Sequence, residues 1–240
     1  MNNKLFTQQT LDSSLFHIQD VVGDNACFYR ALANYIFYIS DNANIQELLE
    51  FKTWGQLRDL QEVDEAFGEY SQLQNFVAKN LQIMIHKYIS NNPTEKLEDM
   101  GNITIEEAVP MIHEIEWEEY LAYYCKFAGD CEMEETEEFY IDRWGSVLEQ
   151  CIISKLIQCP LIVLNTQRWD KKHGKIVNGK IVHSKAQKGV RFKPTTIIGK
   201  KYTNKPPIYL IWREYNGEGH YLACYPKNQR QVLHLIHKIV

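Results

Sequence analysis

The sequence has no apolar run long enough to span a membrane, and residues 1–9 lack the apolar stretch of a secretory signal peptide. Its six cysteines lack the regular spacing of a secreted disulfide framework, which favours a reducing compartment. Internal repeats and low-complexity linkers are also missing. We therefore expect no membrane association, a cytoplasmic location and one domain over residues 1–240.

Metal binding is also poorly supported by the sequence. His113, Cys125 and Cys131 lie within twenty residues of one another, but no close Cys-x-x-Cys pair accompanies them. Core packing explains these side chains better. We expect neither a metal nor another cofactor.

Charge is divided unevenly along the chain. Residues 1–150 hold 9 Lys and Arg against 28 Asp and Glu, whereas residues 151–240 hold 17 against 3. The most basic part, residues 168–205, has 12 cations and one acid. A basic surface can bind nucleic acid. However, the whole chain carries −5 and few aromatic residues lie among these lysines, so a solvated face is the favoured interpretation.

The first half of the chain has the apolar periodicity of helices. We predict helices over residues 27–39 and 71–88, with a break at Asn91-Asn92-Pro93. A further helix is predicted to begin at Thr104, with glutamates in its first turn, and Pro110 is expected to kink it or delay its start.

Short strands are predicted after the middle of the chain. Asn178-Gly179 favours a hairpin turn within residues 176–182. The last stretch, residues 231–240, fits either a strand or a helix. The other predicted strands are residues 159–164, 207–212 and 221–225, the last two as neighbours joined by a loop that carries His220.

Two distant residues form a candidate catalytic pair. Cys27 follows a turn-forming Gly-Asp-Asn stretch and precedes an apolar helical run, so the positive end of the helix dipole favours its thiolate. His220 follows Gly-Glu-Gly at the start of a β-prone run. This pattern is typical of a cysteine nucleophile and its base, although each residue taken alone is better explained as a core residue.

The flanks of these residues resemble the OTU (ovarian tumour) family of cysteine deubiquitinases. Residues 24–29, Asp-Asn-Ala-Cys-Phe-Tyr, are similar to the family's Asp-Gly-Asn-Cys block. Residues 144–149, Trp-Gly-Ser-Val-Leu-Glu, and residues 219–221, Gly-His-Tyr, resemble its second and third blocks in the same order. The resemblance implies a mixed α/β (α+β), papain-like OTU fold. Its central, mostly antiparallel sheet would be flanked by helices, with a helical insertion around residues 41–140.

The resemblance also implies roles for individual residues. Cys27 would be the nucleophile, His220 the general base and acid, and Asp24 the carboxylate that orients the imidazole. A helix cap or turn residue is the alternative for Asp24. Backbone N–H groups of the loop that contains Asn25 and Ala26 would hold the oxyanion.

Two departures from the family pattern concern the same machinery. The glycine after the aspartate is missing, and Asn25 can take its positive φ most easily among other residues. Leu222 stands where many members carry an Asn or Asp that orients the histidine.

The implied partner is ubiquitin or polyubiquitin, with ubiquitin-like modifiers as further candidates. Trp144, Gly145 and Gly219 would line a narrow channel for its glycine-glycine tail. Glu137 and Glu138, in an acidic run, would hold the arginines of that tail, or would simply be solvated.

Two other functions remain open at this point. One is a ubiquitin-binding module with little or no turnover, and the other is a cysteine protease that cuts an unmodified polypeptide. The altered loop suits a viral or bacterial protein that acts in the cytoplasm of a host cell.

Overall fold

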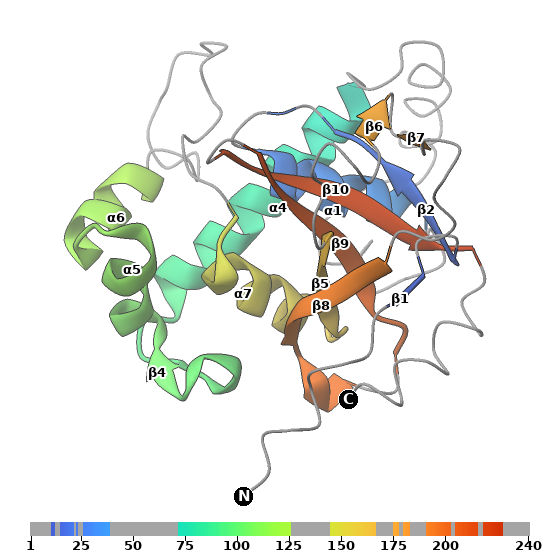
Figure 1. Cartoon of the computed structure of the whole chain (residues 1–240). Coiled ribbons are helices and arrows are strands. Elements are labelled where there is room, and N and C mark those ends of the chain that lie inside the picture. The colour runs from blue at the N-terminus through green and yellow to red at the C-terminus, as the bar shows by residue number, and fades with distance from the viewer. Residues whose placement is uncertain are drawn as a thin grey trace, which may run out of the picture. The chain divides into compact units, whose positions relative to one another are not determined.

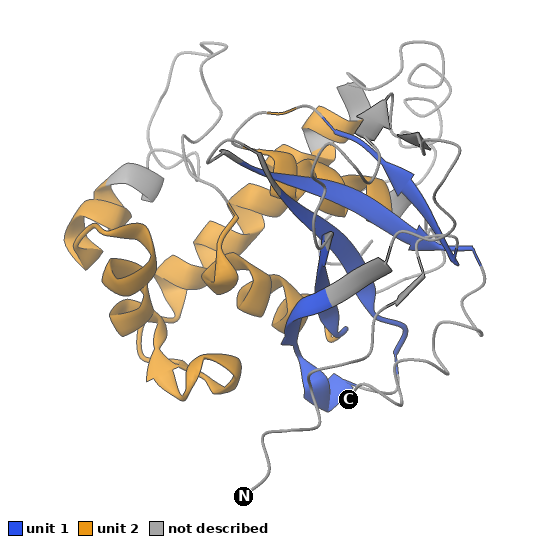
Figure 2. Ribbon diagram, viewed as in Figure 1, with its two compact units in different colours: residues 1–21, 159–240 blue, residues 22–158 orange. Residues whose placement is uncertain are grey.

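The computed structural model describes residues 11–12, 15–21, 23, 26–38, 72–125, 145–166, 175–177, 180–182, 191–202, 205–215 and 218–227. The chain divides into two units (Figure 2). Unit 1 combines Met1–Val21 with Cys159–Val240, and unit 2 is Val22–Gln158, which contains the predicted insertion around residues 41–140.

Unit 1 is built on a six-stranded mixed sheet in the order β1-β8-β5-β9-β10-β2 (Figure 1). β5 and β9 are parallel, and the other four neighbouring pairs are antiparallel. The mixed α and β class predicted from the sequence is therefore confirmed. The strands are β1 Leu11–Asp12, β2 Phe16–Gln19, β5 Leu161–Thr166, β8 Arg191–Ile198, β9 Ile208–Tyr215 and β10 Glu218–Pro226.

One face of this sheet carries an apolar core made of alternate residues on four strands. Successive side chains of a strand point to opposite faces, so every second residue contributes. The rings of Phe16 and Tyr209 meet edge to face with centroids 5.3 Å apart. The buried members of this core are Phe16, Ile162, Leu164, Tyr209, Ile211, Leu222 and Cys224.

The long helices described in the structure belong to unit 2. α1 packs against α4, and both α4 and α5 contact α7. The helices are α1 Cys27–Tyr38, α4 Gln72–Asn91, α5 Ile105–His113, α6 Trp117–Cys125 and α7 Val147–Ile157. A small hairpin, β3 Lys96–Leu97 with β4 Ile103–Thr104, encloses the 3-10 turn η2 Glu98–Met100.

These helices confirm most of the predicted boundaries. α4 ends at Asn91, where Asn92 and Pro93 follow. α5 is N-capped by Thr104, whose side chain accepts the Glu107 N–H. The expected delay at Pro110 was wrong, because the proline lies inside α5.

Unit 1 confirms the predicted strands with one correction. β6 Lys175–Val177 and β7 Lys180–Val182 form a separate antiparallel pair, as the Asn-Gly turn predicts. β9 and β10 are neighbours. His220 lies inside β10 rather than in a loop before it, since the strand already begins at Glu218. The last residues, 231–240, fall outside the described part.

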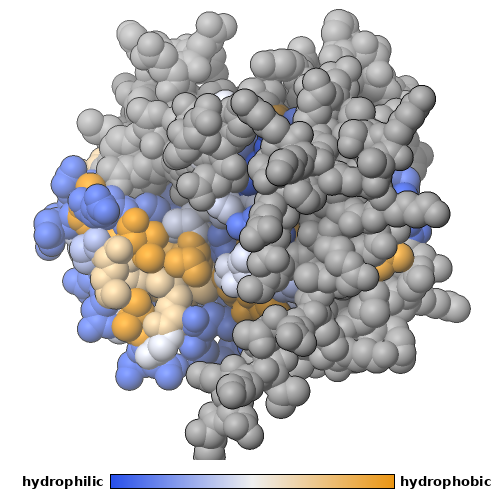
Figure 3. Space-filling view, in the orientation of Figure 1, coloured by the Kyte–Doolittle hydropathy of each residue, from blue (hydrophilic) through white to orange (hydrophobic). Residues whose placement is uncertain are grey.

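The two units carry opposite charge. Unit 2 has 26 Asp and Glu against 9 Lys and Arg, a net −17, and unit 1 has 5 against 17, a net +12. Apolar side chains gather over α5 and its surroundings on the face that Figure 3 shows, with hydrophilic residues around them. Within the described residues, no helix has the length and apolarity to cross a membrane.

Candidate active site

Cys27 is the first residue of α1, as its sequence context predicts. The carbonyl of Ala26 accepts the N–H of Arg30 at 3.0 Å and so begins the helical hydrogen bonds. The first turn of α1 has no acidic side chain, so no carboxylate offsets the positive end of the helix dipole there. Cys27 is nevertheless only 2% exposed.

The thiols of Cys151 and Cys224 stay protonated near neutral pH. Burial raises the pKa of Cys151 to about 12 and raises that of Cys224 well above its usual range. Cys159 is 1% exposed and directly precedes Pro160 at the entrance to β5. These three residues pack in the interior.

A chain of buried polar groups anchors α1. The Tyr29 hydroxyl lies 3.3 Å from Nε2 of His86, and Nδ1 of His86 lies 2.7 Å from the Tyr120 hydroxyl. Burial lowers the pKa of His86 to about 3, so its ring is neutral at physiological pH. A neutral imidazole has one donor and one acceptor nitrogen, and each can meet one tyrosine hydroxyl. These hydrogen bonds connect α1, α4 and α6, and Tyr29 lies two residues after Cys27.

Gly145 brings the second sequence block to the first. A Cβ atom added to Gly145 would stand 2.0 Å from Cδ1 of Phe28, the residue directly after Cys27. Phe28 is fully buried. Only glycine permits this approach of the backbone to the ring, which gives Gly145 a packing role that is compatible with the channel wall predicted for it.

The rest of the second block forms a capping box at the start of α7. Ser146 Oγ accepts the Leu148 N–H at 3.1 Å, and Glu149 Oε2 accepts the Ser146 N–H at 2.7 Å. Glu149 is 1% exposed, and its Oε1 lies 2.9 Å from Nε2 of His113. Burial works to raise the pKa of Glu149, but the His113 hydrogen bond and charge and the Ser146 hydrogen bond lower it to about 2.

In unit 1, His220 is hydrogen bonded to Asp20. Its Nε2 lies 2.8 Å from Oδ1 of Asp20, which also accepts the Val21 N–H at 3.0 Å. A carboxylate only accepts, so Nε2 carries the hydrogen of this bond. Both side chains are partly exposed, at 21% for His220 and 27% for Asp20.

Strand alternation explains why these two residues meet. β2 pairs with β10 so that Ile18 lies opposite Cys224, and both side chains belong to the core face. The alternation on this face continues from Ile18 to Asp20, the residue directly after β2, and along β10 from Cys224 to Leu222 and His220.

Leu222 explains the second departure from the family pattern. It is completely buried in the sheet core, where a polar side chain would lack partners. The carboxylate that holds His220 belongs to Asp20, directly after β2. Sequence reasoning missed Asp20. The available signal was alternation, because Asp20 follows Phe16 and Ile18 at every second position and so belongs to the same face as these two core residues.

The remaining predicted residues are distributed as follows. Ala26 is 1% exposed beside Cys27 in unit 2. Gly219 lies in β10 opposite Glu214. Outside the described residues lie Asp24, Asn25, Glu137, Glu138 and Trp144, and their predicted roles stay predictions.

Comparisons with known proteins do not assign the chain to a family. No family model matches the chain, and no curated protein matches it. In the described part of the chain, no group of three or more His, Cys, Asp or Glu side chains is placed to hold a metal ion.

Proposed function

We propose that the chain is an OTU-type cysteine deubiquitinase that hydrolyses the bond after the C-terminal glycine of ubiquitin, with Cys27 and His220 as its catalytic pair. The observation that carries the proposal is the 2.8 Å hydrogen bond between His220 and Asp20. A carboxylate that fixes one imidazole nitrogen makes the other available as base and acid. The third block of the family resemblance predicted this function for His220.

The chemical steps follow from the positions of the protons. Nδ1 of His220 takes the thiol proton of Cys27, and the thiolate attacks the carbonyl carbon of the terminal glycine. Backbone N–H groups at the start of α1 and in the loop before it stabilise the oxyanion. The C–N bond breaks as Nδ1–H protonates the leaving lysine amine, which leaves a thioester on Cys27. Nδ1 then deprotonates a water that attacks the thioester and releases the thiol.

The burial of Cys27 supports a ubiquitin-like tail as substrate. Cys27 as a whole residue is 2% exposed, and two terminal glycines bring no side chains to obstruct an approach to it. A protease of ordinary polypeptides has to accommodate side chains on both sides of the scissile bond. This observation therefore favours the deubiquitinase over the general protease.

A binding module with little turnover is the second candidate, because the same burial limits access to the sulfur. The discriminating probe is ubiquitin with a thiol-reactive group at its C-terminus. A deubiquitinase forms a covalent one-to-one adduct that Cys27→Ala abolishes. A chain that binds the probe without adduct is a binding module, and the hydrolase proposal is then wrong.

Turnover is measured with linkage-defined di-ubiquitins. We expect cleavage by the native chain and none by Cys27→Ala or His220→Ala. A geometric test needs no activity: in His220→Cys, a short bifunctional thiol reagent should link position 220 to Cys27. Lys201→Cys, an exposed position on η3 Lys200–Tyr202, is the matched control. Cross-linking of Cys27 to position 201 but not to position 220 would contradict the proposed pair.

A further inference from the structure

Three successive rows of residues cross the core face of β9 and β10. Tyr209 lies opposite Cys224, and Ile211 lies opposite Leu222. The third row pairs Arg213 with His220. Directly opposed residues of antiparallel strands share a face, with Cβ atoms about 4.5–5.5 Å apart. The Arg213 side chain therefore emerges from the sheet beside the His220 imidazole.

Burial changes at this third row. The side chains of the first two rows are at most 1% exposed and form the apolar core. His220 and Arg213 are both only partly buried. The polar row thus stands at the rim of the core, where solvent or a substrate can reach it. Arg213 is the only cation that β9 and β10 contain.

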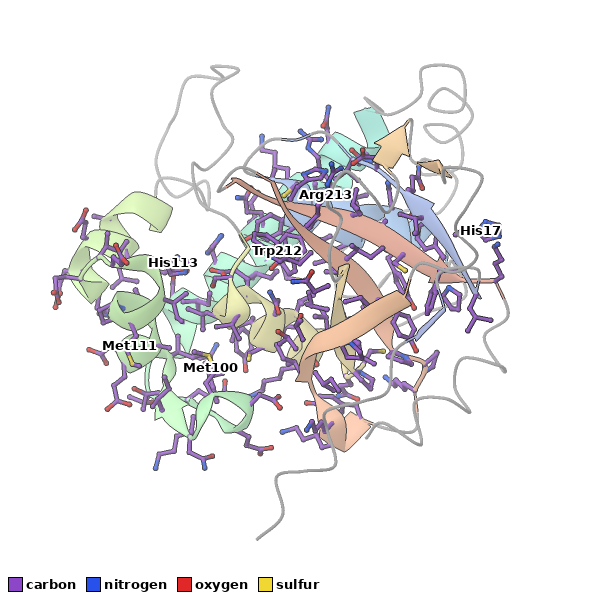
Figure 4. The ribbon with its side chains drawn as sticks, in the orientation of Figure 1. His17, Met100, Met111, His113, Trp212 and Arg213 are labelled. Atoms are coloured by element: carbon purple, nitrogen blue, oxygen red, sulfur yellow. The ribbon has the colours of Figure 1, made fainter. Side chains whose placement is uncertain are left out.

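An aromatic pair on the opposite face stabilises this register. Trp212 and Tyr221 are cross-strand partners, and their ring centroids lie 4.7 Å apart. Figure 4 shows Trp212 and Arg213 together at this end of β9. Slippage of β9 by one residue would move Arg213 to the other face and break the ring contact. The register therefore holds Arg213 directly opposite His220 on the same face of the sheet.

We propose that Arg213 is a specificity residue that binds a carboxylate of the substrate on the leaving-group side, so that the enzyme prefers acceptor lysines flanked by Asp or Glu. This inference rests on the proposed function of His220. The imidazole gives its proton to the departing lysine amine, so the acceptor polypeptide leaves from the His220 side. The nearest charged neighbour of His220 across the strand pair is Arg213. A guanidinium at a partly exposed site can bind a carboxylate with two parallel hydrogen bonds.

The test uses three substrates that differ only beside the scissile isopeptide. Ubiquitin is joined through its C-terminal glycine to the lysine of a short peptide whose flanking residues are acidic, neutral or basic. For the native chain, kcat/KM for the acidic peptide should exceed that for the neutral peptide by roughly fivefold to tenfold. The basic peptide should be the slowest, and added salt should reduce these ratios.

Variants of Arg213 separate recognition from folding, because a ratio of rates within one variant is unaffected by a lower folded fraction. Arg213→Gln should equalise the three substrates, and Arg213→Glu should favour the basic one. Arg213→Lys should keep the order with smaller ratios. Lys201→Gln is the control and should leave every ratio native, since η3 precedes the start of β9 at Ile208 and Arg213 lies five strand positions, roughly 16 Å, further along β9.

The outcomes distinguish the inference from the function on which it rests. If the native chain cleaves all three peptides at the same rate, the specificity role of Arg213 is wrong but the proposed function stands. Loss of activity in Arg213→Gln with native ratios retained assigns Arg213 to structure and also overturns it. Failure of the native chain to cleave any of the peptides overturns the proposed function and the inference together.

Discussion

His220 and Asp20 are 200 positions apart in the sequence, and a hydrogen bond of 2.8 Å joins their side chains. The pairing of β2 with β10 creates this contact, because it brings the end of β2, which Asp20 follows, beside the last described strand. The Val21 N–H holds the same carboxylate oxygen in place. The orientation of the imidazole is thus set by backbone pairing as well as by one side chain.

Asp20→Asn tests the orienting role. An asparagine amide can present a donor to Nε2 and favour the wrong tautomer, so we expect turnover of di-ubiquitin to fall by roughly two orders of magnitude or more. Substrate affinity, compared between Cys27→Ala and the double variant Cys27→Ala with Asp20→Asn, should change little. Asp24→Asn is the matched control, since the sequence predicts the orienting role for that residue. A severe loss in Asp24→Asn with near-native rates in Asp20→Asn would return the role to Asp24.

Gly145→Ala should destabilise unit 2 through overpacking. The added methyl would stand 2.0 Å from the Phe28 ring, and such crowding of a full core costs about 1–3 kcal/mol of unfolding free energy. Denaturant-induced unfolding measures the loss. The double variant Gly145→Ala with Phe28→Leu should recover part of it, because the smaller side chain leaves room. Strictly additive effects of the two changes would contradict the contact.

The capping box of α7 should contribute more stability than the equivalent box of α5. Ser146→Ala should cost about 1 kcal/mol, and Glu149→Gln about 2 kcal/mol or more, because Glu149 is buried and also bound to His113. Thr104 and Glu107 form the same box at an exposed position. Glu107→Gln is therefore the matched control and should destabilise less. If Glu149→Gln and Glu107→Gln lowered the unfolding free energy equally, burial of Glu149 would not strengthen its capping box.

Acid should destabilise the fold in a defined range of pH. The pKa of His86 is about 3 in the folded chain against 6.5 for an unperturbed histidine, so the unfolded state binds its proton more readily. Its contribution to stability is complete above pH 6.5 and is lost as the pH falls toward 3. Glu149, with a pKa of about 2 against 4.5, acts in the same sense between pH 4.5 and 2.

Unfolding free energies measured from pH 7.5 to 4.5 check this expectation. His86 alone adds a slope of up to about 1.4 kcal/mol per pH unit below pH 6.5. His86→Gln keeps a donor and an acceptor for the two tyrosines and removes the titration, so its curve should be flatter. An unchanged slope in His86→Gln would assign the acid sensitivity to other groups.

Local signals predicted the elements that carry the candidate site. The apolar run after the Gly-Asp-Asn stretch predicts a helix, and α1 accordingly begins at Cys27 and extends to Tyr38. Asn92 and Pro93 end α4 because proline cannot continue the helical hydrogen bonds. The Ser-x-x-Glu spacing of residues 146–149 is itself a capping signal, and these residues form the capping box of α7.

The positions of residues within the sheet were harder to predict from the sequence. His220 was expected in a loop because glycines precede it, yet pairing with β9 extends β10 back to Glu218. Asp20 was not identified, because its role depends on which strand lies beside β2. That neighbour is almost the whole chain away, and no local propensity encodes it.

The sequence by itself determined where the thiol sits on its helix, which segments alternate or repeat, and how unevenly charge is divided. Only the tertiary structure decided that Asp20 and Arg213 are the neighbours of His220 and that Gly145 packs on Phe28. The physical reason is range: helix ends and turns are set by residues a few positions apart, whereas strand register and core contacts are set by burial of faces contributed by distant segments.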